Sequence, residues 1–317
     1  MARPRPAWTP PLRDGVAASR VAVGEGRFAN VAEFLDARFP GVGGWPARLA
    51  RGDVLDADGQ PLSAMSSCPH GLLIWYWRDP PPETRVPFEL ELLHQCERLV
   101  VVDKPHFLPV APSGRFLHET ALVRLKRLLG IATLVPMHRI DLDTAGVLVF
   151  TVQPEQRNAY QALLRERRVH KVYEAVAPWR EELVLPLTCR HRLQDGPGDA
   201  FMQMQVVAGD PNTETRVELI ERVAPRHDAP DTPLALYRLT PRTGRRHQLR
   251  AQMNALGAPI VGDRIYPHLY PALAPGETPD YTRPLQLLSR EFGFTDPIDG
   301  QARRFVSRRR LQTEAAA

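Results

Sequence analysis

The sequence predicts an α+β fold that consists of a small N-terminal α/β module and a larger C-terminal domain. Apolar runs rich in β-branched residues, typical of strands, occur at residues 99–102 and 147–150. Between them, residues 120–129 carry apolar side chains at helical spacing. The proline run at residues 80–82 cannot donate sheet hydrogen bonds and favours an extended linker, so we place the domain boundary there.

The elements can be assigned in chain order. The N-terminal module is predicted to contain a helix at residues 31–39, with Asn30 as N-cap, and a strand at residues 72–77. The larger domain is predicted to add a helix at 155–168, strands at 169–176 and 236–239, and a helix that Gly257 closes. We assign residues 1–28 to a loose arm rich in Pro and Arg, 29–79 to the module, 80–85 to the linker, 86–310 to the larger domain, and 311–317 to a tail.

The charge of the chain favours an anionic partner. Its 317 residues carry a formal net charge of +5. Of the 41 basic side chains, only Lys104, Lys126 and Lys171 are lysines, and the planar guanidinium of arginine suits stacking and bidentate phosphate contacts. The basic composition is therefore usable for binding RNA.

The cysteines and the hydropathy pattern exclude several classes of protein. Cys68, Cys96 and Cys189 are far apart and have no metal-ligand spacing, which argues against a disulfide framework or a zinc site. The first 20 residues lack the apolar stretch of a secretory signal, and no run approaches the ~20 apolar residues of a membrane span. We expect a cytoplasmic protein with no membrane contact.

The most informative segment, residues 138–150, places a polar turn just before an apolar strand. His138-Arg139-Ile140-Asp141-Leu142-Asp143-Thr144-Ala145-Gly146 leads into Val147-Leu148-Val149-Phe150. A carboxylate in such a turn, at the edge of a buried strand, is suitably placed for a catalytic acid or base. Aspartates that cap a loop would give the same pattern.

This segment resembles the His-Arg-Leu-Asp-x-x-Thr-Ser-Gly signature of the RluA-type pseudouridine synthases, with Ile140 and Ala145 as substitutions. Three further segments resemble motifs of the same family, in family order. They are the strand ending in Asp103-Lys104-Pro105, the Lys171-x-Tyr173-x-Ala175 strand, and Arg242-Thr243-Gly244-Arg245-Arg246-His247-Gln248-Leu249-Arg250. The family's Gly-x-x-Val-His after the first motif is absent, and Leu288-Ser289 stand where the family has His-Ala.

The resemblance implies a catalytic domain with a mixed, mostly antiparallel sheet and an activity that converts uridine in ribosomal or transfer RNA to pseudouridine. It assigns catalysis to Asp141, proton transfer at C5 of the base to Tyr173, and orientation of Asp141 to Arg245. Substrate-binding residues on the same basis are Arg139, Lys104, Lys171, Arg242, His247 and Arg250. No metal or other cofactor is implied, and we expect a monomer. The order of helix, Gly-Asp turn and strand in residues 29–79 is similar to an S4-type RNA-binding module.

The isomerisation requires breaking the C1′–N1 bond, turning the base and joining C5 to C1′. A carboxylate serves this either as a nucleophile or by removing a sugar proton. Two other classes of function remain open. One is a catalytically silent RNA-binding relative, although the joint presence of Asp141, Tyr173 and Arg245 argues against it. The other is a metal-dependent phosphotransferase or hydrolase with Asp141 and Asp143 as Mg²⁺ ligands, for which Asp263 is the only available third acid.

Overall fold

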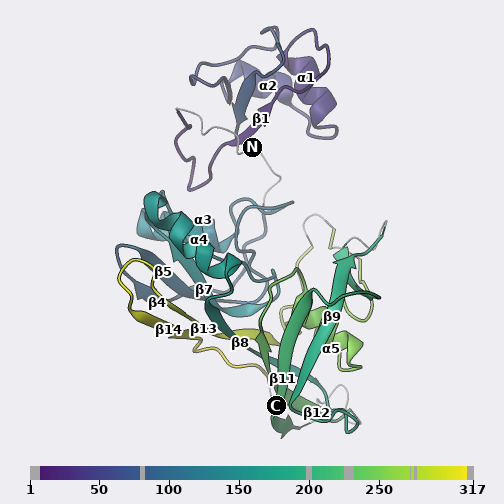
Figure 1. Cartoon of the computed structure of the whole chain (residues 1–317). Helices are drawn as coiled ribbons and strands as arrows, with labels where there is room; N and C mark the ends of the chain where they lie inside the picture. Colours follow the sequence, from purple (N-terminus) through teal and green to yellow (C-terminus); the bar gives the residue numbers. More distant parts are fainter. Residues whose placement is uncertain are drawn as a thin grey trace.

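The computed structural model describes residues 8–78, 83–197, 202–224, 232–271, 273–274 and 277–312. The predicted linker at residues 80–85 lies outside these residues except for its last three positions. Figure 1 shows the small N-terminal unit, in purple, at one end of the molecule and the larger sheet at the other.

The larger domain is built on one 11-stranded sheet in which the strand order is β10-β9-β11-β12-β8-β13-β7-β5-β4. Two further strands pair off this path, β14 with β13 and β6 with β7. All pairings are antiparallel except that of β13 with β7, so the predicted mixed, mostly antiparallel sheet is confirmed. The strands are β4 (Glu91–Gln95), β5 (Leu99–Lys104), β6 (Val135–Pro136), β7 (Ala145–Thr151), β8 (Val169–Pro178), β9 (Leu187–Asp195), β10 (Met204–Val207), β11 (Thr213–Val223), β12 (Leu234–Pro241), β13 (Leu287–Thr295) and β14 (Ala302–Val306).

Two helices cover opposite faces of the part of the sheet that contains β5 and β7. Val100 and Val102 of β5 pack with Leu125 of α3 (Ala121–Leu129). Leu99 and Val101 point to the other face, where α4 (Arg157–Arg165) contributes Tyr160 and Leu163. A 3-10 turn, η1 (Pro154–Gln156), precedes α4. Every residue of β5 and β7 is buried, which explains why both segments read as continuous apolar runs.

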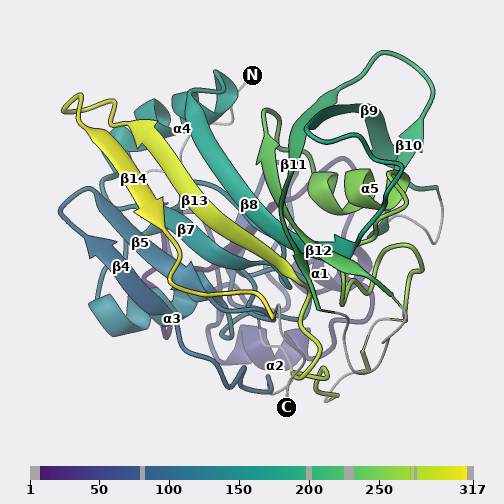
Figure 2. The same cartoon turned by 90° about the horizontal axis from the view of Figure 1, so that it is seen from below.

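The other half of the sheet encloses the helix that follows the arginine-rich motif. Helix α5 (Gln248–Ala255) packs Leu249 and Met253 into the main core, while Ala251 contacts a small cluster with Leu193 of β9. Figure 2 shows α5 lying within the curve formed by β9, β10 and β11. This enclosure fixes the helix N-terminus, and with it the preceding arginine-rich turn, against the sheet.

The N-terminal unit has its own three-stranded sheet with order β1-β3-β2, formed by β1 (Ser19–Ala22), β2 (Val54–Leu55) and β3 (Leu73–Tyr76). Helices α1 (Val31–Arg38) and α2 (Trp45–Ala50) complete it, and Asn30 caps α1 by accepting a hydrogen bond from Glu33 N. The interpretation of residues 1–28 as a loose arm is wrong for β1, because that strand pairs with β3. Residues 1–7 lie outside the described structure.

Candidate functional site

Asp141 lies in the turn that leads into β7, and its side chain is 28% exposed. The turn closes with a hydrogen bond from Thr144 N to Asp141 O. Its other end is fixed by His138, whose ring stacks on Phe292 at 4.2 Å between centroids and accepts a hydrogen bond from Val149 N. Burial lowers the pKa of His138 to about 3, so the ring is neutral near pH 7. The carboxylate is thus held on a fixed turn.

Lys104 is fully buried, so the prediction that it contacts RNA is wrong. Its Nζ donates to three backbone oxygens, those of Pro105, Leu108 and Leu142, at 2.9, 2.7 and 3.0 Å. Burial lowers the pKa of Lys104 to about 7, against the opposing charges of Asp143 and Asp141. Although Lys104 ends strand β5, the chain at Pro105, Leu108 and Leu142 folds back over its side chain. Lys104 supports the turn of Asp141 through the Leu142 carbonyl.

His106 stands in the stretch that departs from the family's first motif. Its Nδ1 lies 2.6 Å from the carbonyl oxygen of Asp143, and since a carbonyl only accepts, that nitrogen carries the hydrogen. Burial lowers the pKa of His106 to about 4. The altered stretch therefore gives the turn after Asp141 a second side-chain anchor.

Arg250 is the cation that pairs with Asp141. Its Nη1 donates to Asp141 Oδ2 at 3.3 Å, and its Nε and Nη2 donate to the two oxygens of Asp263 at 2.8 and 2.6 Å. Burial alone would lower the pKa of Arg250, but the hydrogen bonds and charges of Asp263 and Asp141 raise it above its ordinary value. The guanidinium stays charged, and Asp263 fixes its plane.

Arg245, which we predicted as the partner of Asp141, is exposed in the loop before α5. The assignment of Arg245 is wrong, because the arginine that pairs with Asp141 is Arg250, five residues further along in helix α5. Arg250 is the third residue of α5, only 1% exposed, and helical side chains lean back toward the N-terminus. It therefore reaches the turn of Asp141 from inside the domain, whereas Arg245 lines the mouth of the cavity.

Tyr173 lies on β8 and faces the same cavity as Asp141, with 9% of the residue exposed. Burial raises its pKa to about 12, a hydrogen bond with Ser289 on β13 lowers it, and the charge of Asp141 raises it. The phenol is therefore protonated at neutral pH.

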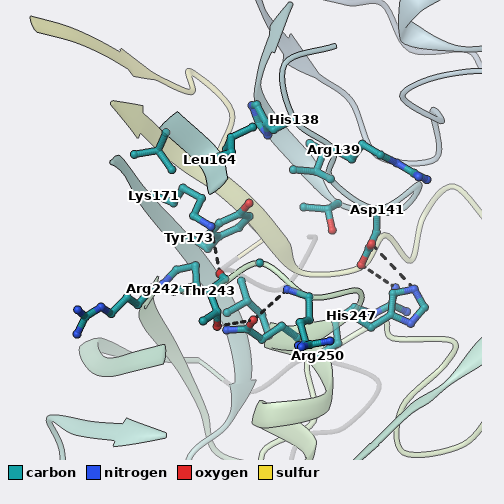
Figure 3. Close-up of a pocket in the computed structure, with 18 of the residues that line it drawn as sticks. His138, Arg139, Asp141, Leu164, Lys171, Tyr173, Arg242, Thr243, His247 and Arg250 are labelled. Atoms are coloured by element: carbon teal, nitrogen blue, oxygen red, sulfur yellow. Dashed lines mark hydrogen bonds and ion pairs between the residues drawn. The ribbon is translucent and has the colours of Figure 1, made fainter. Parts of the chain in front are cut away.

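A cavity of about 560 Å³ lies between the turn of Asp141, strand β8 and the N-terminus of α5. Figure 3 shows the lining side chains converging on it from these three places. Every predicted site residue except Lys104 lines it. The predicted residues gathered there are Arg139, Asp141, Lys171, Tyr173, Arg242, Arg245, His247 and Arg250. His247 Nε2 lies 4.0 Å from Asp141 Oδ1, and burial lowers the pKa of this imidazole. The four exposed arginines at the mouth are Arg139, Arg167, Arg242 and Arg245.

Gln248 holds the arginine-rich turn in shape, a function that sequence reasoning missed. Its side-chain oxygen accepts from Arg245 N and from the Thr243 hydroxyl, and its Nε2 donates to Thr215 Oγ1 on β11. Lys171 Nζ donates to Thr243 O at 3.1 Å. Asp263 was also missed as the partner of Arg250, although a buried arginine predicts a buried acid nearby. These contacts fix the backbone from which the exposed arginines project.

The metal-dependent alternative finds no support in the arrangement of the acids. In the part of the chain that the structure describes, no group of three or more His, Cys, Asp or Glu side chains is placed to hold a metal ion. Asp263, the proposed third ligand, accepts hydrogen bonds from Arg250 and from the backbone N–H groups of Ile265 and Tyr266.

Among the described residues, no helix is both long and apolar enough to span a bilayer.

Known proteins are similar to this domain in both sequence and fold. Residues 98–255 match the family model described as RNA pseudouridylate synthase. An uncharacterized RNA pseudouridine synthase of Synechocystis sp. is 30% identical over 223 residues, covering 70% of this chain and 73% of that protein. The dual-specificity RNA pseudouridine synthase RluA of Haemophilus influenzae is 32% identical over 230 residues, covering 68% of this chain and 91% of that protein.

A solved structure, human RNA pseudouridylate synthase domain containing 1, has a TM-score of 0.57 and 20% identity over 72% of this chain and 86% of its own. It shows the shared fold. The chain belongs to the RNA pseudouridylate synthase family. Within that family it is of the RluA type, an RNA uridine isomerase.

Proposed function

We propose that Asp141 is the catalytic carboxylate of this RNA pseudouridine synthase and acts on the ribose of a uridine that has left the RNA stack. The observation that carries the proposal is the position of Asp141. Its carboxylate faces a cavity of about 560 Å³ and is paired from the buried side with Arg250. An ionised carboxylate with one face open to substrate and the other held by a fixed cation suits attack at C1′ or removal of a sugar proton.

Two residues near Asp141 have separate roles in the proposed reaction. Tyr173 faces the cavity as a protonated phenol, so we propose that it contacts the uracil ring and takes part in proton transfer at C5. The C5 proton is lost and N1 gains one, so the product has the composition of the substrate. For this reason we propose that the reaction uses no cofactor. Arg250 keeps its charge throughout and orients Asp141.

The mouth of the cavity suits the phosphates and bases that flank the target. Arg139, Arg242 and Arg245 are exposed there, and arginine both pairs with phosphate and stacks on bases. We propose that Arg139 occupies or stacks beside the space that the extruded uridine leaves, a contact worth about 1–3 kcal/mol per base. Lys171 donates a hydrogen bond to the Thr243 carbonyl and so supports the turn that contains Arg242.

We propose transfer RNA or ribosomal RNA as the substrate. Relatives support this, since tRNA pseudouridine synthase C of Vibrio parahaemolyticus is 35% identical over 182 residues, covering 56% of this chain and 73% of that protein. Three free cysteines are compatible with the cytoplasm, and we propose that the protein works there as a monomer. We further propose that residues 29–79, together with strand β1, form an S4-like module joined to the catalytic domain of residues 86–310 by the linker at 80–85. Arg48 of this module is buried beside Trp45, so RNA contact there would fall to Arg51.

The test maps pseudouridine by a specific chemical tag in small and large RNAs from cells with and without the protein. A site that disappears in the deletion strain, returns with the wild-type chain, and stays absent with Asp141→Asn supports the proposal and names the substrate. A site restored by Asp141→Asn would remove the catalytic assignment. Identical maps in all strains would contradict the proposed activity on cellular transfer and ribosomal RNA.

A further inference from the structure

Helix α4 ends at the rim of the cavity in a turn with left-handed backbone. The last helical residue is Arg165, and the carbonyl oxygens of Leu163 and Leu164 accept hydrogen bonds from Arg168 N and Arg167 N. Arg167 has a φ of +57°. Glycine usually occupies this position after a helix, because an L side chain is strained there. The chain thus has an arginine where its backbone favours glycine.

Left-handed backbone at residues other than glycine is found partly at the cavity itself. Among the described residues, it occurs at Asp14, Phe107, Arg167 and His247. Two of these four, Arg167 and His247, line the cavity. Strained backbone costs stability and clusters at functional sites. The conformation of Arg167 therefore indicates a function for its side chain.

Strand β8 leads from the turn of Arg167 to the inner part of the cavity. Because side chains of a strand alternate between its faces, Val169, Lys171 and Tyr173 share one face, and all three line the cavity with Arg167. Figure 3 shows Leu164, Lys171 and Tyr173 following one another along one side of the cavity. The Cα atoms of Arg167 and Tyr173 are six residues apart, which limits their separation to about 20 Å. Arg167 is therefore at the outer end of a row that leads to Tyr173.

The guanidinium of Arg167 is exposed, and in the part of the chain that the structure describes it makes no hydrogen bond or ion pair. The neighbouring Arg168 differs, since its Nε and Nη2 lie 2.8 and 2.7 Å from Glu166 Oε2. Arg167 thus gains no contact within the described structure that would offset the strain of its backbone. Its planar group has donors available for an anion, and phosphate is the anion that RNA presents.

We propose that Arg167 binds a backbone phosphate of the RNA strand beside the target uridine, and that this contact accounts for an arginine at a position that favours glycine. The proposal rests on the RNA substrate proposed above. Arg242 and Arg245 come from the segment between β12 and α5, so Arg167 adds a cation to the mouth from a different element, the end of α4.

The test compares wild type with Arg167→Gly, Arg167→Asn and Arg168→Asn. The last variant is the matched control, because it removes the same exposed charge one position away and the described lining of the cavity does not include Arg168. RNA affinity is measured by filter binding at several salt concentrations, with transfer and ribosomal RNA from a strain that lacks the protein. Single-turnover rates at saturating RNA and melting temperatures are measured on the same full-length proteins.

We expect Arg167→Gly to change stability and RNA affinity in opposite directions. The melting temperature should rise by about 2–4 °C, because glycine adopts this φ without strain. RNA affinity should fall about fivefold at 0.1 M salt, and the slope of log K against log salt should decrease by about 0.7. Partial unfolding of the variant would not produce this combination.

The other variants separate the contact from a general effect of charge. Arg167→Asn should lose as much affinity as Arg167→Gly, whereas Arg168→Asn should lose less than about twofold. The single-turnover rate at saturating RNA should stay within about twofold of wild type in all three, because a flanking phosphate contact contributes to binding rather than to the chemical step.

Four results would overturn the inference. They are wild-type affinity in Arg167→Gly, an equal loss of affinity in Arg168→Asn, a lower saturating rate with unchanged affinity, and a lower melting temperature in Arg167→Gly. A wild-type protein that binds RNA but forms no pseudouridine would contradict the proposed function instead, and the affinities of the variants would still report the contact of Arg167.

Discussion

The cavity has two sides that are built in opposite ways. On the inner side, Asp141 is paired with Arg250, which is 1% exposed and is itself held by a fully buried Asp263. On the outer side, Arg242 is 70% exposed and lies 3.6 Å from Glu214, and Arg245 is exposed as well. The inner side is constrained by buried, charge-assisted hydrogen bonds, and the outer side carries charge on long side chains in solvent.

The difference indicates a division of labour. A group that stabilises a transition state must be in place before the substrate arrives, and burial among fixed partners achieves this. A group that attracts RNA gains from long-range charge and tolerates several geometries, because most of its contribution comes from counterion release. We therefore expect inner substitutions to affect kcat or stability and outer substitutions to affect RNA affinity and its salt dependence.

The largest effect should come from Asp141→Asn. The substituted side chain retains its shape but loses the charge that acts on the ribose, so we expect turnover to fall by on the order of 10³-fold or more. RNA affinity, measured by filter binding, should change by less than about threefold. Asp195→Asn is the matched control, since Asp195 is 77% exposed and paired with Arg246 at the surface. An equal loss in the control would contradict the comparison.

The next largest effect should separate two arginines five positions apart. Arg250→Lys keeps a positive charge but cannot bind Asp263 in two places while reaching Asp141, so we expect kcat to fall about 100-fold and the melting temperature to drop. Arg245→Lys keeps the exposed charge, and kcat should stay within about twofold. The reverse order of effects would restore Arg245 as the partner of Asp141.

A third effect tests the inner side through pH. Burial lowers the pKa of His138 to about 3 in the folded protein from its ordinary 6.5. Between these values the unfolded chain binds the proton and the folded chain does not, so the free energy of unfolding decreases as pH falls from 6.5 to 3. His138→Asn should reduce that loss by on the order of 2 kcal/mol in urea titrations at several pH values. His268→Asn, at an exposed histidine, should leave the profile unchanged.

The smallest effect concerns the outer side. Arg242→Ala and Arg245→Ala should each weaken RNA binding severalfold at 0.1 M salt and leave kcat nearly unchanged. Each should also reduce the slope of log K against log salt by about 0.7–0.9, as expected for one lost phosphate contact. An unaltered slope together with a lower kcat would contradict their assignment to RNA binding and would indicate that these residues act in the reaction itself.

Local patterns in the sequence were sufficient to predict the local structure. The apolar runs of β5 and β7, the alternation in β8 and the stripe of α3 predicted these elements to within a few residues. The turn of Asp141 was found in the same way, because a polar turn before a buried strand is a short-range signal. The placement of Arg139, Tyr173 and Arg242 at one cavity came from the resemblance to a family and not from spacing.

The errors all concern contacts between distant segments. The hydrogen bond of Arg250 to Asp141 spans 109 residues, and nothing within the motif distinguishes an arginine that points inward from one at the surface. Lys104 was predicted to contact RNA, but its ammonium donates to the carbonyl oxygen of Leu142, which comes from another segment of the chain.

The order of these three strands in the chain has a consequence for synthesis on the ribosome. β7 and β8 emerge well before β13, although β13 is the strand that fills the space between them. The growing chain therefore carries two strands whose facing edges have no partner until Leu287–Thr295 has been made. Unpaired edges of this kind readily accept strands from other molecules. Nascent chains of this enzyme should thus depend on chaperones late in translation, an expectation that ribosome profiling of chaperone contacts would test.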